Sequence, residues 1–427
     1  MLDTIDFIRQ WLYQPGEGLY SAIDADYQGH DGRFYLRNDQ QLSDLPSDLV
    51  KQAGMSTYCF EACEYKGIEF SQPFTKDAKK MRSVLAAQLP IKPHIDRKII
   101  TSWNALTIWG LAESYALLTV NEAVNEALMS ENERESIKTF AIDLANTLWD
   151  KHLVNDAKDG PVLYRDSFVG KLNDKGALAD HVFFAKALFG LFDITQDKRY
   201  LQRAKLLVDM VNSQFKRPDG SYAMTAINDK SNLAVSMSQT KDTELLAAGA
   251  LMVSVMQDLW RRGGDIEMKK AMKVATNPLK GRLKQDGLNH LFAASVVSSV
   301  ERNLIASTQY FAAGKGRVDL SYDGQKWRLA FSLAGGWHVN SHTPLQSYLR
   351  PTNVRITKDM PLKVNYPDGK KVRLGFQKEP LSVFEHQFEI DIVPTKVISK
   401  PATVVMDVQA CSDRVCLLPE KLKFALF

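Results

Sequence analysis

The chain has 427 residues, of which 45% are hydrophobic and 24% charged, and this composition is typical of a folded protein and excludes a disordered one. Its 54 basic and 50 acidic residues give a net charge of +4 without a basic stripe, so nucleic-acid binding is not indicated. No apolar run approaches the roughly 20 residues that cross a bilayer, and four cysteines are too few for a disulfide-built scaffold. The length predicts two domains.

The N-terminal segment MLDTIDFIRQWLY carries Asp3, Asp6 and Arg9 within an apolar pattern, which predicts an amphipathic helix rather than a signal peptide. Helical hydrophobic spacing continues to about residue 300, for example from Ile137 to Leu148. We expect further helices near 102–119, 176–195, 200–215, 241–261, 265–284 and 287–302.

A repeat runs through this helical part. Each copy has the end of a helix, a glycine turn and a short extended segment with an aromatic residue, as around Gly18, Gly160 and Gly220. Repeated helix pairs of this kind indicate a solenoid or a closed ring of hairpins. The sequence predicts about eight helices, against about twelve in a closed ring of six hairpins, so we expect an incomplete ring.

From about residue 314 the pattern changes to short stretches that alternate apolar with polar residues. They are RVDLSYD, KWRLAFSLA, NVRIT, KVRLGF, HQFEIDIV, ATVVMDVQA and KLKFALF, separated by glycine turns. Short strands in this number predict an antiparallel, immunoglobulin-like β-sandwich. We therefore expect a helical domain over 1–303, a joint over 303–313 and a β-sandwich over 314–427.

Cys411 and Cys416 lie in VQACSDRVCLLPEKLKF and bracket the turn between the last two predicted strands. Antiparallel neighbours bring Cα atoms within disulfide range, and the short loop constrains the unfolded chain little. An exposed hairpin tip favours thiol exchange, and Arg414 would favour a thiolate. The alternatives are a local staple, two idle thiols, or half of a zinc site completed by Cys59 and Cys63.

Several polar residues of the helical part are candidates for binding a sugar: Asp24, Asp26, Trp103, Asn104, Asp180 and Asp242. Paired acids can serve as general acid and base, and a tryptophan can stack on a sugar ring. The structural alternative, which we favour, has the carboxylates capping turns and the tryptophan in the core. His338 and His342 could suit a metal on a helix, but in a strand or loop their spacing means little, so we expect no metal and no cofactor.

The helical part resembles the YyaL-type, thioredoxin-domain-containing proteins. The matching stretches are residues 18–36 (GLYSAIDADYQGHDGRFYL) and 92–114 (KPHIDRKIITSWNALTIWGLAES), with weaker ones at 176–201 and 239–254. The resemblance implies a partial (α/α) toroid like those of six-hairpin glycosidases and sugar epimerases. The family's thioredoxin domain and early helices have no counterpart, so we expect the C-terminal piece of such a protein. DTELLAAGA departs from the family's Asp-Gly-Ala near Asp242, which implies an altered pocket.

The strand part resembles the N-terminal, periplasmic domain of the thiol:disulfide interchange protein DsbD. The match runs through residues 335–354 (GGWHVNSHTPLQSYLRPTNV), 381–390 (LSVFEHQFEI) and 408–424. In that family two cysteines form a redox pair, which by resemblance implies Cys411 and Cys416 as the catalytic residues. Four residues separate them here, whereas five separate them in the best-known members, so their geometry and redox potential do not carry over.

Two functions follow as hypotheses. The first is a thiol–disulfide interchange protein, with the toroid as scaffold or recognition domain and an exchange-partner protein. The second is a carbohydrate-active or sugar-binding toroid with an accessory sandwich, which the missing helices disfavour. No signal peptide or membrane span is predicted in this chain. We expect the periplasm if a preceding segment carries an export signal, and the cytoplasm otherwise.

Overall fold

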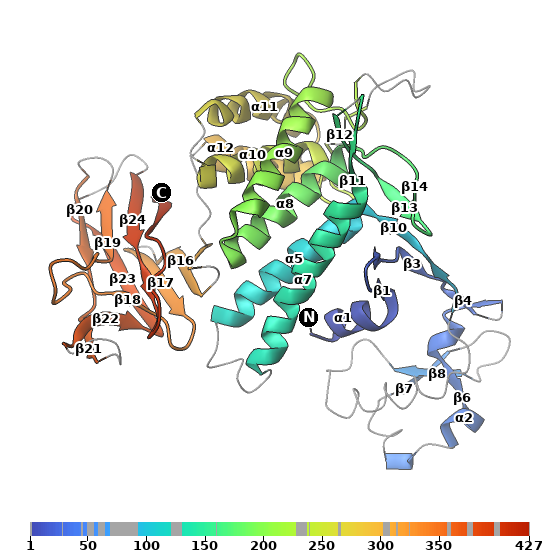
Figure 1. Cartoon of the computed structure of the whole chain (residues 1–427), viewed down its shortest axis with the longest axis horizontal. Coiled ribbons are helices and arrows are strands. Elements are labelled where there is room, and N and C mark those ends of the chain that lie inside the picture. The colour runs from blue at the N-terminus through green and yellow to red at the C-terminus, as the bar shows by residue number, and fades with distance from the viewer. Residues whose placement is uncertain are drawn as a thin grey trace. The chain divides into compact units, whose positions relative to one another are not determined.

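The computed structural model forms two compact units, residues 2–15 with 19–99 and residues 1, 16–18 and 100–427, and each is described by itself (Figure 1). The residues that the structure describes are 2–27, 29–43, 46–48, 55–58, 65–68, 93–120, 130–158, 160–227, 237–238, 240–263, 266–301, 308–312, 315–323, 325–356, 360–373, 379–396 and 402–426.

The first unit is built from short elements. The expected N-terminal helix is present as α1 (Leu2–Phe7), which continues as the π-helical turn η1 (Ile8–Leu12). Instead of further long helices, the described residues form α2 (Asp39–Ser43), the 3-10 turn η2 (Arg33–Tyr35) and the strands β1 (Tyr13–Gln14), β2 (Gly18–Leu19), β3 (Ala22–Ile23), β4 (Asp26–Tyr27), β5 (His30–Asp31), β6 (Arg37–Asn38), β7 (Met55–Tyr58), β8 (Tyr65–Ile68) and β9 (Ile95–Asp96). Turns with positive φ at Gly29 and Gly32 interrupt the chain here, because glycine adopts that conformation at little cost.

The helices of the second unit follow the short strand β10 (Lys98–Ile100). They are α5 (Thr101–Val120), α7 (Glu131–His152), α8 (Leu178–Thr195), α9 (Lys198–Gln214), α10 (Ala248–Gly263), α11 (Ile266–Gln285) and, after the 3-10 turn η3 (Gly287–His290), α12 (Leu291–Glu301). Helix α5 packs on α7 and α8, α8 also on α9 and α10, and α10 on α11 and α12 (Figure 1). The expected helix from residue 241 begins later, at Ala248.

Each of three helical hairpins, α5/α7, α8/α9 and α10/α11, is closed at its base in the same way. A backbone N–H at or before the first helix donates to a carbonyl after the second helix. The pairs are Thr101 with Arg165 at 2.8 Å, Leu178 with Met224 at 2.8 Å and Asp242 with Asn289 at 3.1 Å. Helix α12 follows the third hairpin. The predicted partial (α/α) toroid is confirmed in this form, as antiparallel hairpins without a closed ring among the described residues.

Glycine turns join successive hairpins, as the repeat predicts. After α7 the chain forms β11 (Leu153–Asp156), β12 (Gly160–Leu163), β13 (Asp166–Phe168) and β14 (Lys171–Leu172). Gly160 has φ 73° and Gly220, after α9, has φ 86°. At Gly220 an added Cβ would lie 3.0 Å from Val274 Cγ1 and 3.3 Å from its carbonyl oxygen, so both the turn and the packing require glycine there.

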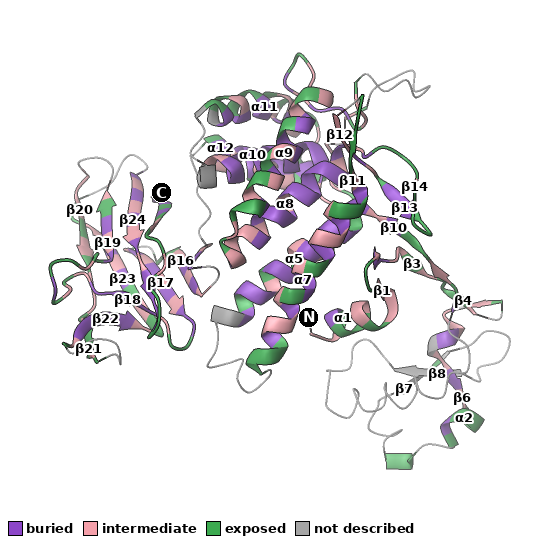
Figure 2. Ribbon diagram, viewed as in Figure 1, coloured by how far each residue is buried: buried purple, intermediate pink, exposed green. Residues whose placement is uncertain are grey.

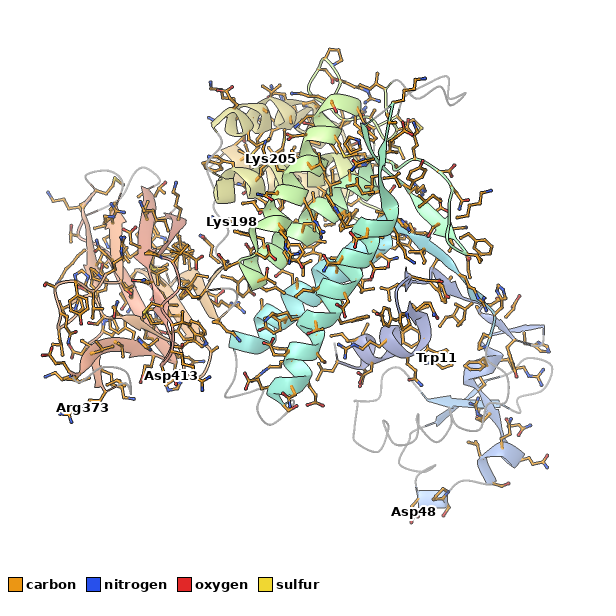
Figure 3. The ribbon with its side chains drawn as sticks, in the orientation of Figure 1. Trp11, Asp48, Lys198, Lys205, Arg373 and Asp413 are labelled. Carbon is orange, nitrogen blue, oxygen red and sulfur yellow. A yellow bond between two sulfur atoms is a disulfide. The ribbon has the colours of Figure 1, made fainter. Side chains whose placement is uncertain are left out.

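Position in the stack explains the residue pattern of the helices. Helix α8 contacts α5, α9 and α10, and most of its side chains are buried, including Phe183, Phe184 and Phe189 (Figure 2). Helix α9 packs mainly on α8 and leaves its other face to solvent. It is amphipathic, with Lys198 and Lys205 exposed (Figure 3). A helix with neighbours on several sides is apolar around most of its circumference.

The strands after residue 307 form three antiparallel sheets around one core. One has the order β15-β16-β17-β23-β20, with strands Thr308–Phe311, Gly316–Tyr322, Trp327–Leu333, Gln387–Pro394 and Leu362–Asn365. A second has the order β21-β22-β18-β25, with Lys370–Val372, Leu381–Glu385, His338–Asn340 and Ala410–Cys411. The third is β19-β24-β26, with Asn353–Ile356, Ala402–Val408 and Glu420–Leu426. All three sheets contribute to one buried apolar cluster, which includes Phe331, Val339 and Phe424, and the immunoglobulin-like sandwich is confirmed.

The seven predicted strand stretches all contain strand, but four further strands were missed: β15, β18, β20 and β22. The last residue of ATVVMDVQA, Ala410, belongs to a separate short strand, β25. Strand β15 lies in the segment that the sequence analysis took as a joint. The predicted boundary at 303 and 314 falls within the second compact unit, so the domain limits stay a prediction. None of the described helices is long and apolar enough to cross a membrane.

Candidate redox site

The two cysteines lie in the connection between β24 and β26, which pair antiparallel from Ala402 with Leu426 to Val408 with Glu420. This connection forms a smaller hairpin of its own. Cys411 ends β25 and forms an isolated antiparallel bridge with Cys416. The N–H of Leu417 donates to the carbonyl of Ala410 at 2.9 Å, so the chain on both sides of the cysteine pair is held together by its backbone.

Ser412 fixes the four-residue turn between the cysteines. Its hydroxyl accepts hydrogen bonds from the N–H groups of Arg414 and Val415, both at 3.2 Å. Its own N–H donates to the Val415 carbonyl at 2.8 Å. Serine and aspartate at the start of a turn satisfy backbone N–H groups in this way, so the Ser-Asp-Arg-Val sequence itself produces the tight reversal. The turn sets the two sulfur atoms beside each other.

Cys411 and Cys416 form a disulfide, with the sulfur atoms 2.05 Å apart and the Cα atoms 4.0 Å apart. The two residues differ in exposure. Cys411 is only 3% exposed, whereas Cys416 is an exposed residue. Asp413, on the turn between them, lies at the surface of the sandwich (Figure 3). A partner thiolate therefore has access to the bond from the Cys416 side.

A row of polar side chains crosses the sheet beside Cys411. Strand β18 lies between β22 and β25, and His338 is the direct partner of Cys411 on one side and of Glu385 on the other. Lys370 Nζ lies 2.9 Å from Glu385 Oε2. Directly opposed residues of antiparallel strands project to the same face. Lysine, glutamate, imidazole and disulfide thus follow one another across one face of the sheet.

Burial and charge act in opposite directions on His338. The residue is 3% exposed, and this burial lowers the pKa of its imidazole, while the nearby Glu385 carboxylate raises it. Burial dominates, so the ring is neutral at neutral pH while the disulfide is intact.

Arg414 has less influence on the cysteines than the sequence suggested. Its side chain is 89% exposed, and its Nε lies 3.8 Å from a carboxylate oxygen of Asp413. Water screens an exposed charge, and the neighbouring carboxylate offsets it, so we expect Arg414 to contribute little to a thiolate.

The surface around the redox loop is partly apolar and partly charged. Val415 and Leu418, on either side of Cys416 in the chain, are 50% and 80% exposed. A hollow of about 590 Å³ lies beside the same connection. Its lining includes Gln409 and Pro419 from the connection itself, Arg350, Lys421, and an Arg355–Asp407 ion pair.

Among the predicted sugar-binding residues, Asp180 and Asp242 lie at the bases of hairpins and bind backbone. Asp180 is fully buried, and its two oxygens accept from the N–H groups of Ser102 at 3.0 Å and Ala177 at 2.8 Å. Asp242 accepts from the N–H groups of Ala247 at 3.1 Å and Phe292 at 2.9 Å. Each carboxylate thus satisfies donors at the starts of two helices. Binding of a substrate by either one stays a prediction.

The remaining candidates of the helical part differ in their surroundings. Asp24 and Asp26 are exposed, and an oxygen of Asp24 accepts from the Asp26 N–H at 3.0 Å, as in the turn-capping alternative. Trp103, on α5, is 45% exposed and so lies outside the core that the alternative predicted. Asn104 is 2% exposed, and its amide donates to the Ile100 carbonyl at 3.0 Å. A sugar-binding role for these four residues also stays a prediction.

Two further predictions concern metals. Cys59 and Cys63 lie outside the described residues. The His342 ring stacks on Tyr366 at 3.7 Å between centroids and approaches the Thr352 carbonyl at 3.2 Å. His338 instead adjoins Cys411, a neighbour that the sequence did not reveal because the spacing of WHVNSH says nothing about which strand lies beside it.

Comparison with known families agrees with this geometry. Residues 307–427 match the family described as thiol:disulfide interchange protein DsbD, N-terminal. The predicted resemblance of the strand part is confirmed by this match, which covers the disulfide, His338 and Glu385.

Curated relatives match the chain over parts of their length. An uncharacterized protein of Caenorhabditis elegans, B0495.5, is 22% identical over 255 residues, 60% of this chain and 32% of its own. The human spermatogenesis-associated protein 20 is 28% identical over 126 residues, 29% of this chain and 15% of its own. The chain thus spans a third or less of the length of these relatives.

Solved structures show distant likeness. The reduced DsbD N-terminal domain of Neisseria meningitidis is 16% identical with a TM-score of 0.21, over 26% of this chain and 82% of that one. The complex of the DsbD and PilB N-terminal domains from the same organism gives 16% and 0.22, over 26% and 80%. Cellobiose 2-epimerase of Spirochaeta thermophila gives 14% and 0.32, over 46% and 53%.

Proposed function

We propose that this protein is a thiol–disulfide interchange protein whose reactive groups are Cys411 and Cys416. The observation that carries the proposal is the bonded cysteine pair, one residue buried and one exposed, within a domain that matches the DsbD N-terminal family. A disulfide that closes so short a loop restricts the unfolded chain little and therefore adds little stability. A redox role explains the bond better than a stabilising role.

Exchange begins at the exposed residue. A partner thiolate attacks Cys416 Sγ in line with the disulfide, a mixed disulfide forms, and the electron pair of the broken bond goes to Cys411 Sγ as a thiolate. A second thiolate of the partner then attacks its own sulfur in the mixed disulfide and releases Cys416. The partner loses two electrons and becomes a disulfide, and the cysteine pair gains them and takes up two protons. The reverse sequence delivers electrons to an oxidised partner.

The partner is a protein with its own cysteine pair. The exposed Val415 and Leu418 beside Cys416 offer apolar contact around the sulfur, and the charged hollow next to the loop offers ionic contact. The solved complex of a DsbD N-terminal domain with a PilB N-terminal domain is a precedent for protein binding by the related domain. The helical hairpins would serve as scaffold or recognition domain for such a partner.

The carbohydrate-active alternative has less support. The carboxylate oxygens of Asp180 and Asp242 accept hydrogen bonds from backbone N–H groups, and Asp24 caps a turn. A general acid or base needs an oxygen that faces the substrate. The exposed Trp103 and Asp26 are the residues that a sugar-binding test should address first.

The experiment measures thiol content by alkylation and mass spectrometry while the purified chain is equilibrated with glutathione mixtures from fully reduced to fully oxidised. We expect Cys411 and Cys416 to convert together and reversibly. Cys411→Ser, which leaves the exposed thiol, should form a mixed disulfide with glutathione readily, whereas Cys416→Ser should do so slowly. A pair that stays oxidised across the whole series, or thiols that never bond, would contradict the proposal.

A further inference from the structure

The starting point is the thiolate that exchange must leave at Cys411. This residue is 3% exposed, and burial disfavours a thiolate and raises the pKa of a thiol. A thiol of high pKa is a poor leaving group and makes exchange slow. Attack at the exposed Cys416 therefore needs something near Cys411 that stabilises negative charge.

His338 is the titratable group placed to do so. Its backbone pairs directly with Cys411, and the two side chains project to the same face of the sheet. The groups that face it from the packed strands are Cys411 on β25 and Glu385 on β22, and Lys370 on β21 neutralises Glu385 from the far side. Cys416 reaches the same row through the disulfide.

We propose that His338 stabilises the Cys411 thiolate formed when the disulfide opens, and so sets the redox potential of the pair. The inference rests on the proposed function. The neutral imidazole donates an N–H to the new thiolate, or takes a proton from solvent and becomes the cation of an ion pair. Glu385 favours that second form, because a carboxylate on the opposite side raises the proton affinity of the ring. His338 thus acts through Cys411, as a positioning residue.

Reciprocity between the two groups gives a test that needs no disruptive substitution. If the imidazole lowers the pKa of the Cys411 thiol, the thiolate must raise the pKa of the imidazole by the same coupling. We expect the NMR titration of His338 to move to higher pH when the full-length chain is reduced. His386, an exposed residue between β22 and β23, provides the internal control, and its NMR signals should be the same in the oxidised and reduced chains.

Substitution supplies the second readout. In chains that also carry Cys416→Ala, the Cys411 pKa is measured from the pH dependence of iodoacetamide alkylation. We expect His338→Phe to raise it by about one unit, a roughly tenfold loss of thiolate at neutral pH. His338→Gln, which keeps an N–H donor, should fall between Phe and wild type, and His386→Asn should match wild type. Circular dichroism and thermal unfolding identify any variant that fails to fold.

With both cysteines present, the glutathione equilibrium gives the consequence for redox chemistry. At a pH above the Cys411 pKa of both chains, where the reduced residue is a thiolate in each, His338→Phe should favour the disulfide about tenfold, which is a fall of about 30 mV in potential for a two-electron couple. The inference is wrong if the Cys411 pKa is the same in His338→Phe and in wild type. It is also wrong if the titration of His338 is the same in the oxidised and reduced chains. Either result leaves the proposed function standing provided that the wild-type pair still exchanges. If the wild-type pair does not exchange, the proposed function is wrong. The alkylation series in Cys416→Ala chains still tests the coupling between His338 and Cys411.

Discussion

The carboxylate of Asp180 accepts a hydrogen bond from the backbone N–H of Ser102 at 3.0 Å and so joins the start of α8 to the start of α5. Its other oxygen accepts from Ala177, and the residue is fully buried. This contact links neighbouring hairpins by a side chain, whereas the bases of the hairpins are closed by backbone bonds.

We expect Asp180→Ala to destabilise the helical hairpins by about 2–4 kcal/mol, because one buried and one partly buried N–H group lose their acceptors. Asp180→Asn keeps one acceptor and should lose less. Urea unfolding followed by circular dichroism measures both. Asp209→Ala on α9, where the carboxylate lies in an exposed ion pair, is the matched control and should change stability by less than about 0.5 kcal/mol. Equal stability of Asp180→Ala and wild type would show that these bonds contribute nothing.

Two buried histidines should each contribute a loss of stability on mild acidification. Burial lowers the pKa of His152 and of His181 to about 4, below the value near 6.5 in the unfolded chain. The unfolded state therefore binds more protons, and the free energy of unfolding decreases as pH falls from about 6.5 toward 4. Glu420, whose pKa is raised to about 7 by burial, acts in the opposite direction, so urea midpoints across this window show the histidine contribution as the difference in slope between wild type and a histidine variant.

The contribution of His152 to this pH dependence can be tested by substitution. Its ring is hydrogen-bonded to the Thr101 hydroxyl at 2.7 Å and to the Ser167 hydroxyl at 3.0 Å. We expect His152→Asn to lower stability at pH 7 but to reduce the slope, because one of the two protonation sites is gone. The exposed His386→Asn should leave both unchanged. A slope that is the same in His152→Asn and wild type would exclude His152 as a source.

Ser412 should control how easily the cysteines pair. In Ser412→Ala the N–H groups of Arg414 and Val415 lose the hydroxyl acceptor, and the turn that brings the sulfur atoms together is less populated after reduction. We expect the glutathione equilibrium to shift toward the dithiol by a few-fold, and Ser412→Asp, which keeps an acceptor, to shift it less. If the two variants oxidise like wild type, the backbone alone determines the turn.

Reduction of the disulfide should leave the sandwich folded. The core cluster of this domain, with Phe331, Val339 and Phe424, does not depend on the loop, and a bond across so few residues adds little stability. We expect the near-ultraviolet circular dichroism of oxidised and reduced chains to agree and their thermal midpoints to differ by only a few degrees. Loss of the near-ultraviolet signal on reduction would instead make the disulfide a structural staple.

The sequence was sufficient for the parts of the fold that depend on local pattern. Alternating residues predicted β16, β17 and β24, and the turn glycines Gly160 and Gly220 predicted the joints of the hairpins. Short strands such as β18 escaped, because three residues carry no readable alternation and this strand is buried on both sides of the pleat.

Only part of the candidate redox site could be predicted from the sequence, for a related reason. Both cysteines could be read from their spacing and resemblance, but the pairing of His338 with Cys411 depends on a register between strands far apart in the chain. The roles of Asp180 and Asp242 were likewise hidden, since an acid that accepts from the start of a distant helix looks in sequence like an acid in a pocket. Tertiary partners decide such cases.

The three backbone bonds that close the hairpins have a consequence for how this chain opens. Each hairpin contains its own closure and meets mainly the hairpins next to it, so a local fluctuation can release one pair of helices while the next stays formed. Deuterium uptake would then divide along the hairpins, with α8 slowest because it is enclosed on several sides. The helices at the two ends of this stack of hairpins should therefore open most readily, and the helices in its middle least readily.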